Sequence, residues 1–169
     1  MTVIIFEGVD LSGKTYAIEK VAKSLNSGFV LKNAYKPKEV ISDIFIQYHI
    51  ILDLVRDYLP PVILDRFYPS QAVYSYLRGR DDMDSLEINK LEAYAEENEF
   101  LYIYVDTPID VLIKRYEEIG DEHLKITQLE QIKERYEQFF EKTKMKKLRI
   151  STLDDGWLEK TLEFIGDVE

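Results

Sequence analysis

One stretch near the start of the chain reads Gly8-Val9-Asp10-Leu11-Ser12-Gly13-Lys14-Thr15 and matches the pattern G-x-x-x-x-G-K-[ST]. The residues before it, Thr2-Val3-Ile4-Ile5-Phe6, are mostly apolar and β-branched, which predicts a buried strand. The residues after it, 16–25, place apolar side chains near helical spacing. A glycine-rich loop between a strand and a helix is typical of the phosphate-binding P-loop. We therefore predict that this loop binds the phosphates of a nucleotide.

Each part of this loop has a chemical role in phosphate binding. The glycines let backbone N–H groups approach a polyphosphate, and Lys14 places a positive charge near the β and γ phosphates. The hydroxyl of Thr15 can bind Mg²⁺, and the N-terminus of the following helix adds a favourable dipole. The predicted nucleotide-binding residues of this segment are Gly8, Val9, Asp10, Leu11, Ser12, Gly13, Lys14, Thr15 and Tyr16.

The composition excludes several classes of protein. The chain has 169 residues, of which 46% are hydrophobic, so we expect one globular domain over residues 1–169. The net charge of −10 argues against a general DNA or RNA binder, because such proteins present basic faces to the polyanion. The absence of cysteine excludes disulfides, thiolate metal sites and a thiol nucleophile. With no membrane-length apolar run and no signal peptide before the first strand, we expect a cytoplasmic protein.

Predicted strands and helices alternate along the whole chain. The expected strands are 2–6, 28–31, 62–64, 100–105 and 148–150. The expected helices are 16–25, 37–58, 70–78, 85–98, 109–118, 127–143 and 157–165. This alternation predicts an α/β protein with the three-layer P-loop NTPase fold, a five-stranded parallel sheet with helices on both faces. Thr127 is expected to cap the helix that it begins, because Glu130 follows at capping-box spacing.

Asp65 and Arg66 end the third predicted strand, where ligands of parallel sheets bind. The Asp65 carboxylate could hold Mg²⁺ directly or through water. The Arg66 guanidinium could bind a second phosphate through two hydrogen bonds. A surface ion pair at a strand end is the structural alternative, and the P-loop on another strand favours the functional interpretation.

Four segments resemble the thymidylate kinases. Residues 6–15 look like their F-E-G-x-D-x-x-G-K-[ST] loop, and residues 65–74 are similar to their D-R-[YF]-x-x-S-x-x-A-Y segment, with one residue of slippage. The stretch 105–108, followed by Arg115, resembles their D-x-P motif and its downstream arginine. Residues 150–153 lie where that family lines the adenine pocket. The resemblance therefore extends over the whole chain.

The resemblance implies an enzyme that uses ATP and Mg²⁺ to phosphorylate a deoxynucleoside monophosphate. Such a reaction depends on positioning and charge neutralisation. By resemblance, Asp10 contacts the sugar 3′-hydroxyl, Arg66 binds the acceptor phosphate, and Tyr74 and Phe67 pack around sugar or base. Arg115 faces the transferring phosphoryl group, and Ser151 and Leu153 contact the adenine. The implied catalytic residues are Lys14, Asp65, Arg66 and Arg115, the metal residues Thr15 and Asp65, and the acceptor residues Asp10, Lys32, Tyr35, Arg66, Phe67, Ser70 and Tyr74. A homodimer is also implied.

Two segments depart from this family. The expected lid, about 116–126, is short and acidic, whereas many members carry several arginines there. The acceptor loop reads Lys32-Asn33-Ala34-Tyr35-Lys36-Pro37 in place of R-E-P-G-G, and no base-reading arginine is recognisable. Two alternatives therefore stay open. One is a P-loop kinase acting on a nucleoside or a nucleic acid, although the acidic charge argues against the latter. The other is a nucleotide-binding protein without catalysis.

Overall fold

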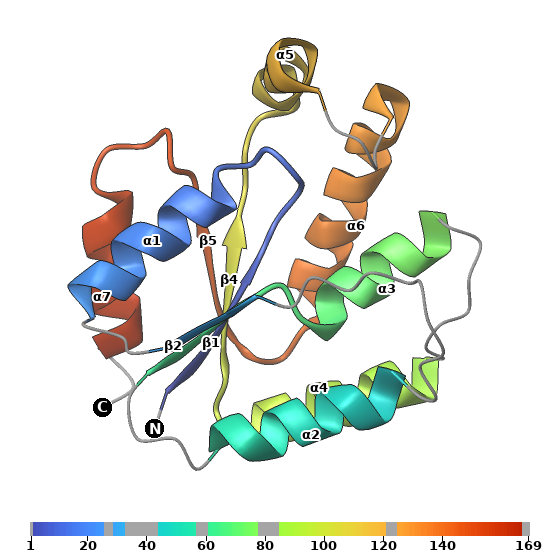
Figure 1. Ribbon diagram of the computed structural model, residues 1–169, viewed down its shortest axis with the longest axis vertical. Coiled ribbons are helices and arrows are strands. Elements are labelled where there is room, and N and C mark those ends of the chain that lie inside the picture. Colours follow the sequence, from blue (N-terminus) through green and yellow to red (C-terminus); the bar gives the residue numbers. More distant parts are fainter. Residues whose placement is uncertain are drawn as a thin grey trace.

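The computed structural model describes residues 2–25, 29–32, 44–56, 61–77, 85–120 and 125–166, and its centre is a parallel β-sheet (Figure 1). Its five strands are β1 (Val3–Glu7), β2 (Phe29–Lys32), β3 (Val62–Asp65), β4 (Leu101–Val105) and β5 (Lys146–Ile150). They pair in the order β2-β3-β1-β4-β5, and all four pairings are parallel. The predicted fold class is confirmed.

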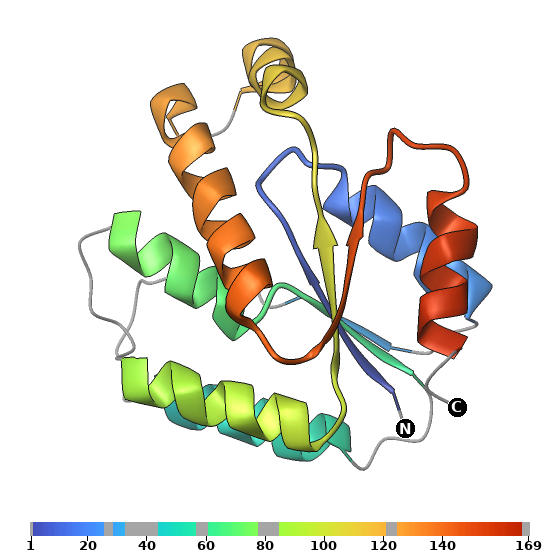
Figure 2. The same cartoon turned by 180° about the vertical axis from the view of Figure 1, so that it is seen from behind.

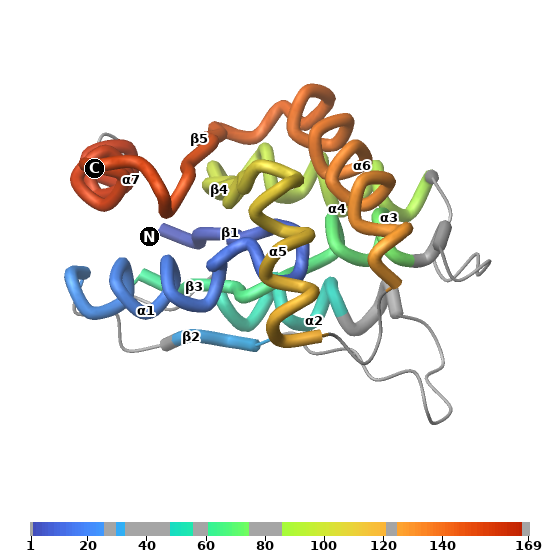
Figure 3. The backbone as a smooth tube through the Cα atoms, turned by 90° about the horizontal axis from the view of Figure 1, so that it is seen from above, coloured from blue at the N-terminus to red at the C-terminus, as the bar shows by residue number. Residues whose placement is uncertain are grey.

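Helices cover both faces of this sheet. They are α1 (Lys14–Ser24), α2 (Ile44–Arg56), α3 (Tyr68–Leu77), α4 (Ser85–Glu97), α5 (Ile109–Ile119), α6 (Leu129–Lys142) and α7 (Trp157–Gly166). Helices α1 and α7 lie side by side on one face, and α2, α3, α4 and α6 lie on the other (Figures 1 and 2). Helix α5 lies across the carboxyl end of the sheet, as Figure 3 shows from above.

The alternation of side chains along β1 divides the apolar core into two layers. Ile4 and Phe6 pack with residues of α1 and α7, whereas Val3 and Ile5 pack on the opposite face. Because successive residues of a strand point to opposite faces, Glu7 shares the face of Val3 and Ile5. By the same alternation in β3, Asp65 points toward the α1 face. The two carboxylates at neighbouring strand ends are therefore directed into different layers.

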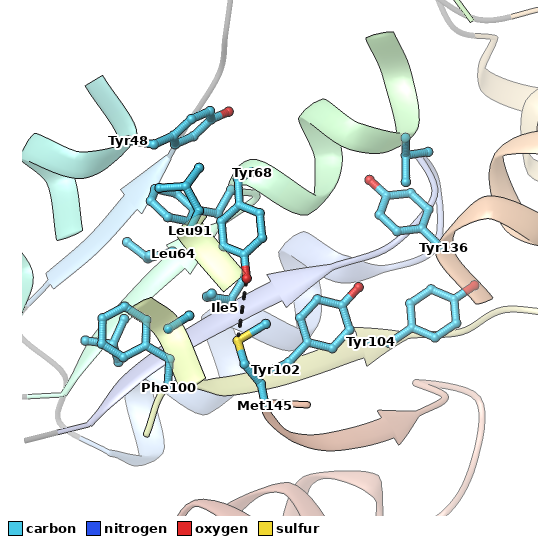
Figure 4. Close-up of a cluster of buried hydrophobic side chains, with 14 of the residues drawn as sticks. Ile5, Tyr48, Leu64, Tyr68, Leu91, Phe100, Tyr102, Tyr104, Tyr136 and Met145 are labelled. Carbon is cyan, nitrogen blue, oxygen red and sulfur yellow. Dashed lines mark hydrogen bonds between the residues drawn. The ribbon is translucent and has the colours of Figure 1, made fainter. Parts of the chain in front are cut away.

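The larger layer of the core is unusually rich in tyrosine. Tyr68, Tyr102, Tyr104 and Tyr136 are all fully buried there (Figure 4). Tyr104 and Tyr136 stack with ring centroids 5.9 Å apart, and the Tyr68 hydroxyl lies 3.9 Å from the sulfur of Met145. In the described part of the chain, the hydroxyls of Tyr102 and Tyr104 have no hydrogen-bond partner.

Most expected element boundaries differ by one or two residues from the observed ones, and two of these differences have a clear physical reason. Strand β5 begins at Lys146 and not at residue 148, and Lys146 pairs with Leu101. Because β5 is an edge strand, it can carry exposed lysines. Lys146 and Lys147 interrupt the apolar pattern, so the sequence did not indicate where the strand begins. Thr127 does not cap a helix: residues Ile126–Gln128 form a 3₁₀ turn, and α6 begins at Leu129. The Gln128 side chain accepts a hydrogen bond from the backbone N–H of Lys125 and closes this turn.

None of the helices in the described residues combines the length and apolar composition that crossing a membrane requires. The cytoplasmic location and the homodimer stay predictions.

Gly8 lies where β1 enters the P-loop, and the loop packs closely against β4 there. A Cβ atom at this position would lie 2.7 Å from the Val105 carbonyl oxygen and 2.9 Å from Ser12 Oγ. We expect Gly8→Ala to lower the free energy of unfolding by about 1–3 kcal/mol, the usual cost of overpacking. Gly166→Ala is the matched control, because a Cβ atom there would meet none of the described residues within 4 Å. Equal denaturant midpoints for the two variants would contradict this expectation.

Candidate active site

The carboxyl ends of the parallel strands meet around one pocket of about 590 Å³. The P-loop follows β1, Arg66 follows β3, and Thr152 follows β5, so three strand ends contribute to the pocket. Helix α5, which follows β4, contributes Arg115 and Ile119. The pocket is lined by Val9, Asp10, Leu11, Ser12, Gly13, Lys14, Thr15, Tyr16, Arg66, Arg115, Ile119 and Thr152. Parallel α/β sheets bind ligands at this edge.

The P-loop is held in a fixed shape by its own backbone and by its neighbours. Leu11 and Gly13 have φ angles of 68° and 85°, in the left-handed region. The Leu11 carbonyl accepts a hydrogen bond from Arg115 at 2.7 Å, and the Ser12 carbonyl accepts one from Thr107 at 2.8 Å. These two carbonyls are therefore engaged from the side of α5. A loop of this kind presents backbone N–H groups to an anion.

Lys14 forms a buried ion pair with Asp65. The two residues are 7% and 9% exposed, so most of this pair is removed from water. Burial, together with the nearby charge of Arg66, lowers the pKa of Lys14 from its usual range, and the Asp65 carboxylate opposes that change. Asp65 thus holds the P-loop lysine in place and helps keep it charged.

Arg66 directly follows β3 and has an unusual backbone. Its φ angle of 68° is rare for an arginine, and its backbone N–H donates to the Phe6 carbonyl at 3.0 Å. The guanidinium pairs with Asp10 and lies 5.3 Å from the centre of the Tyr74 ring. The Tyr74 hydroxyl donates to the second Asp10 oxygen at 2.8 Å. A strained residue at a strand end, held by several partners, is typical of a functional site.

The structure brings only some of the predicted acceptor residues to this site. Ser70 accepts a hydrogen bond from Arg66 at 3.1 Å. Phe67, in contrast, is fully buried in edge-to-face contact with Tyr48 and Tyr68, so its ring is part of the core. Lys32 ends β2 beside Asp65, and its side chain is exposed. Tyr35 and residues 121–124 of the expected lid lie outside the described residues.

The segment after β5 carries Ser151 and Leu153, the residues predicted to contact the adenine, and Thr152 between them. Thr152 lines the pocket, whereas Ser151 and Leu153 are not among the lining residues. The Ser151 hydroxyl instead accepts the backbone N–H of Leu153 at 3.3 Å, and Leu153 is 50% exposed. Thr152 Oγ1 would lie 2.8 Å from a Cβ placed on Gly13, so this threonine packs directly on the loop.

Sequence reasoning missed Glu7 and Tyr136, two fully buried residues on the core side of Arg66. Tyr136 accepts a hydrogen bond from Arg66 at 2.7 Å, although 70 positions separate them in the chain. Tyr136 belongs to the apolar stripe of α6 that includes Leu129 and Ile132, a pattern that indicates only a core position. Glu7 could have been found, because a carboxylate that ends a buried strand needs partners.

No family model matches the chain, and no curated protein matches it. Solved structures do match. The YorR protein from Bacillus subtilis, in complex with phosphorylated GDP, aligns with a TM-score of 0.76 and 21% identity over 98% of this chain and 96% of that chain. The chain has the fold of the P-loop kinases.

Two kinases of known structure also align over nearly the whole chain. Deoxyadenosine kinase from M. mycoides has a TM-score of 0.64 and 16% identity, with 100% of both chains covered. Thymidylate kinase from Candida albicans has a TM-score of 0.62 and 14% identity, with 98% of this chain and 91% of that chain covered. At these identities the likeness establishes the fold.

The position of Lys14 predicts a direct effect on nucleotide binding. At an ATP concentration about 100 times Kd, binding adds about 2.7 kcal/mol of stability, which raises the Tm of a chain of this size by roughly 5–10 °C. We expect Mg²⁺-ATP to produce such a shift in the native protein and none in Lys14→Ala. Lys23→Ala, an exposed lysine in the last turn of the same helix, should keep the shift. A full shift in Lys14→Ala would remove this lysine from nucleotide binding.

Proposed function

We propose that this protein transfers the γ-phosphoryl group of ATP to a deoxynucleoside monophosphate. The observation that carries the proposal is the pair of cationic groups at one pocket. Lys14 belongs to the P-loop, and Arg66 belongs to a separate strand end where Asp10 and Tyr74 surround it. One cation suits the donor phosphates and the other the acceptor phosphate.

Arg66 has the chemistry of an acceptor anchor. A guanidinium can bind phosphate through two parallel hydrogen bonds. Its Nη1 donates to Ser70 and Tyr136, and its Nη2 donates to Asp10. Within the described residues, these contacts involve Nη1 and Nη2 and none involves Nε, so an anion could approach the guanidinium from the Nε side. Asp10 would then lie beside the acceptor, where its carboxylate can accept a sugar hydroxyl.

Mg²⁺ fits the oxygen donors at the other end of the site. Thr15 lines the pocket at the first turn of α1, and Asp65 contacts the adjacent Lys14. A hydroxyl and a carboxylate are the hard oxygen ligands that Mg²⁺ takes alongside phosphate oxygens and water. When bound, the ion would neutralise charge on the donor phosphates. Thr15 and Asp65 are the residues that would hold it.

Arg115 is the candidate for stabilising the transferring group. It lines the pocket from α5 and donates to the Leu11 carbonyl at the edge of the P-loop. Phosphoryl transfer develops charge between donor and acceptor, and a cation placed there lowers the barrier. The similar folds support the proposal, because they include a thymidylate kinase and a deoxyadenosine kinase.

Coupled ADP release with ATP and Mg²⁺ tests the reaction directly. The acceptors are dTMP, dUMP, dCMP, dAMP, dGMP and thymidine, with Lys14→Ala as the blank. We expect turnover above the blank with at least one monophosphate, because the pocket offers a second cation for its phosphate. No turnover with any monophosphate would contradict the proposed function.

Replacing Arg66 separates acceptor binding from donor binding. We expect Arg66→Ala to raise the KM of the monophosphate by roughly 10–100-fold, as for lost hydrogen bonds to a charged group, and to leave the KM of ATP nearly unchanged. Arg149→Ala is the control, since that arginine lies on β5 and pairs with Asp106 and Glu141. Equal losses for both substrates would instead assign Arg66 a structural role.

A nucleoside acceptor is a second candidate, and one observation favours it. The charge of Arg66 is already matched by Asp10, so the acceptor end carries little net charge. A neutral hydroxyl could bind there without displacing Asp10. In the same assay, turnover of thymidine with none on the monophosphates would select this candidate. If ATP raises the Tm but no acceptor supports ADP release, the protein binds nucleotide without catalysing phosphoryl transfer.

A further inference from the structure

A buried polar cluster, formed by Glu7, Ser70 and Tyr136, lies directly against Arg66. Glu7 and Tyr136 are fully buried, and Ser70 is half-buried. Nη1 of Arg66 donates to the Tyr136 hydroxyl at 2.7 Å and to the Ser70 hydroxyl at 3.1 Å. The three residues of the cluster come from β1, α3 and α6, so they join three elements beneath one guanidinium.

The direction of the hydrogen bonds in this cluster follows from its donors and acceptors. An arginine can only donate, so both hydroxyls present lone pairs to Nη1. The Ser70 hydroxyl donates to Glu7 Oε2 at 2.6 Å, and the Tyr136 hydroxyl lies 3.2 Å from the same oxygen. The two hydroxyls are 2.8 Å apart. Glu7 therefore orients the hydroxyls that receive Arg66, without touching the guanidinium itself.

Glu7 also holds the backbone that follows Arg66. Its Oε1 accepts the backbone N–H of Phe67 at 2.7 Å and that of Ser70 at 3.1 Å. Phe67 directly precedes α3 and Ser70 lies in its first turn, where backbone N–H groups lack the usual helical acceptor. The Ser70 N–H also donates to the Phe67 carbonyl at 3.1 Å. Burial raises the pKa of the Glu7 carboxyl, and the charge of Arg66 and the hydrogen bonds from Ser70 and Phe67 limit that rise. One carboxylate thus supports both the side chain and the backbone of the Arg66 segment.

We propose that Tyr136 and Glu7 are positioning residues that, together with Ser70, hold the Arg66 guanidinium ready for the acceptor phosphate. This proposal rests on the proposed function of Arg66. A free arginine side chain loses considerable rotamer freedom when it binds, and fixing it beforehand removes that cost from binding. The cluster also links α6 to the acceptor end of the pocket through the Tyr136 hydroxyl.

Tyr136→Phe is the sharpest test, because it removes one hydroxyl and keeps the ring. We expect kcat/KM for the monophosphate to fall about tenfold, the size expected for one hydrogen bond to a charged group, with the KM of ATP unchanged. Tyr104→Phe is the matched control. Its ring stacks on Tyr136, it is equally buried, and within the described residues its hydroxyl has no partner (Figure 4). We expect the control to keep native kinetics.

A spectroscopic measurement tests the positioning without any turnover. The Nη–H resonances of Arg66, assigned by their loss in Arg66→Lys, should exchange faster with water in Tyr136→Phe than in the native protein and in Tyr104→Phe, because Nη1 is the group that donates to Tyr136. Glu7→Gln should have the same effect if it folds, because the new amide cannot accept from every donor that faces it.

The two measurements separate the proposals. If the native protein phosphorylates no monophosphate, the proposed function fails, and the exchange rate of Arg66 still decides whether the cluster positions it. If Tyr136→Phe matches Tyr104→Phe in exchange rate, the positioning proposal is overturned, whatever the native activity. If Tyr136→Phe matches Tyr104→Phe both in the exchange rate of Arg66 and in the kinetics with the monophosphate, Tyr136 only packs in the core.

Discussion

Strand β1 pairs in parallel with β3, in the register that sets Phe6 beside Asp65, and the candidate site depends on this pairing. It brings the P-loop and the Asp65–Arg66 turn to the same edge of the sheet. Because successive side chains of a strand point to opposite faces, Asp65 is directed toward α1 and Lys14, and Glu7 is directed toward α3 and α6. A shift of one residue would exchange these directions and place each carboxylate among the wrong partners.

Opposite charges alternate through the site and hold one another in place. Lys14 pairs with Asp65, Arg66 pairs with Asp10, and buried Glu7 stabilises Arg66 through two hydroxyls. Buried charges are tolerated in a protein when they are paired and hydrogen-bonded. Both cations are therefore fixed in the protein without a ligand, and under the proposed function a phosphate would meet groups that are already oriented. This arrangement suits a reaction that depends on positioning more than on a strong base.

The P-loop is also tied to the elements that follow β4. Thr107 and Arg115 donate to two successive carbonyls of the loop, Ser12 and Leu11. A displacement of α5 would alter both the shape of the loop and the location of its arginine.

The sequence by itself determined the fold class, the location of the phosphate loop and the pairing of Asp65–Arg66 with that loop at one sheet edge. These features depend on local signals: apolar runs of strand length, helical periodicity, and glycines whose backbone geometry other residues resist. Only the tertiary structure decided that Phe67 lies in the core, that Thr152 faces the pocket, and that Glu7 and Tyr136 support Arg66. Tyr136 follows Glu7 by 129 positions. A tyrosine in the apolar stripe of a helix gives the same sequence pattern whether or not its hydroxyl forms a hydrogen bond. Such contacts depend on how separate helices and strands pack. A local sequence pattern does not indicate which side chains from distant elements come into contact.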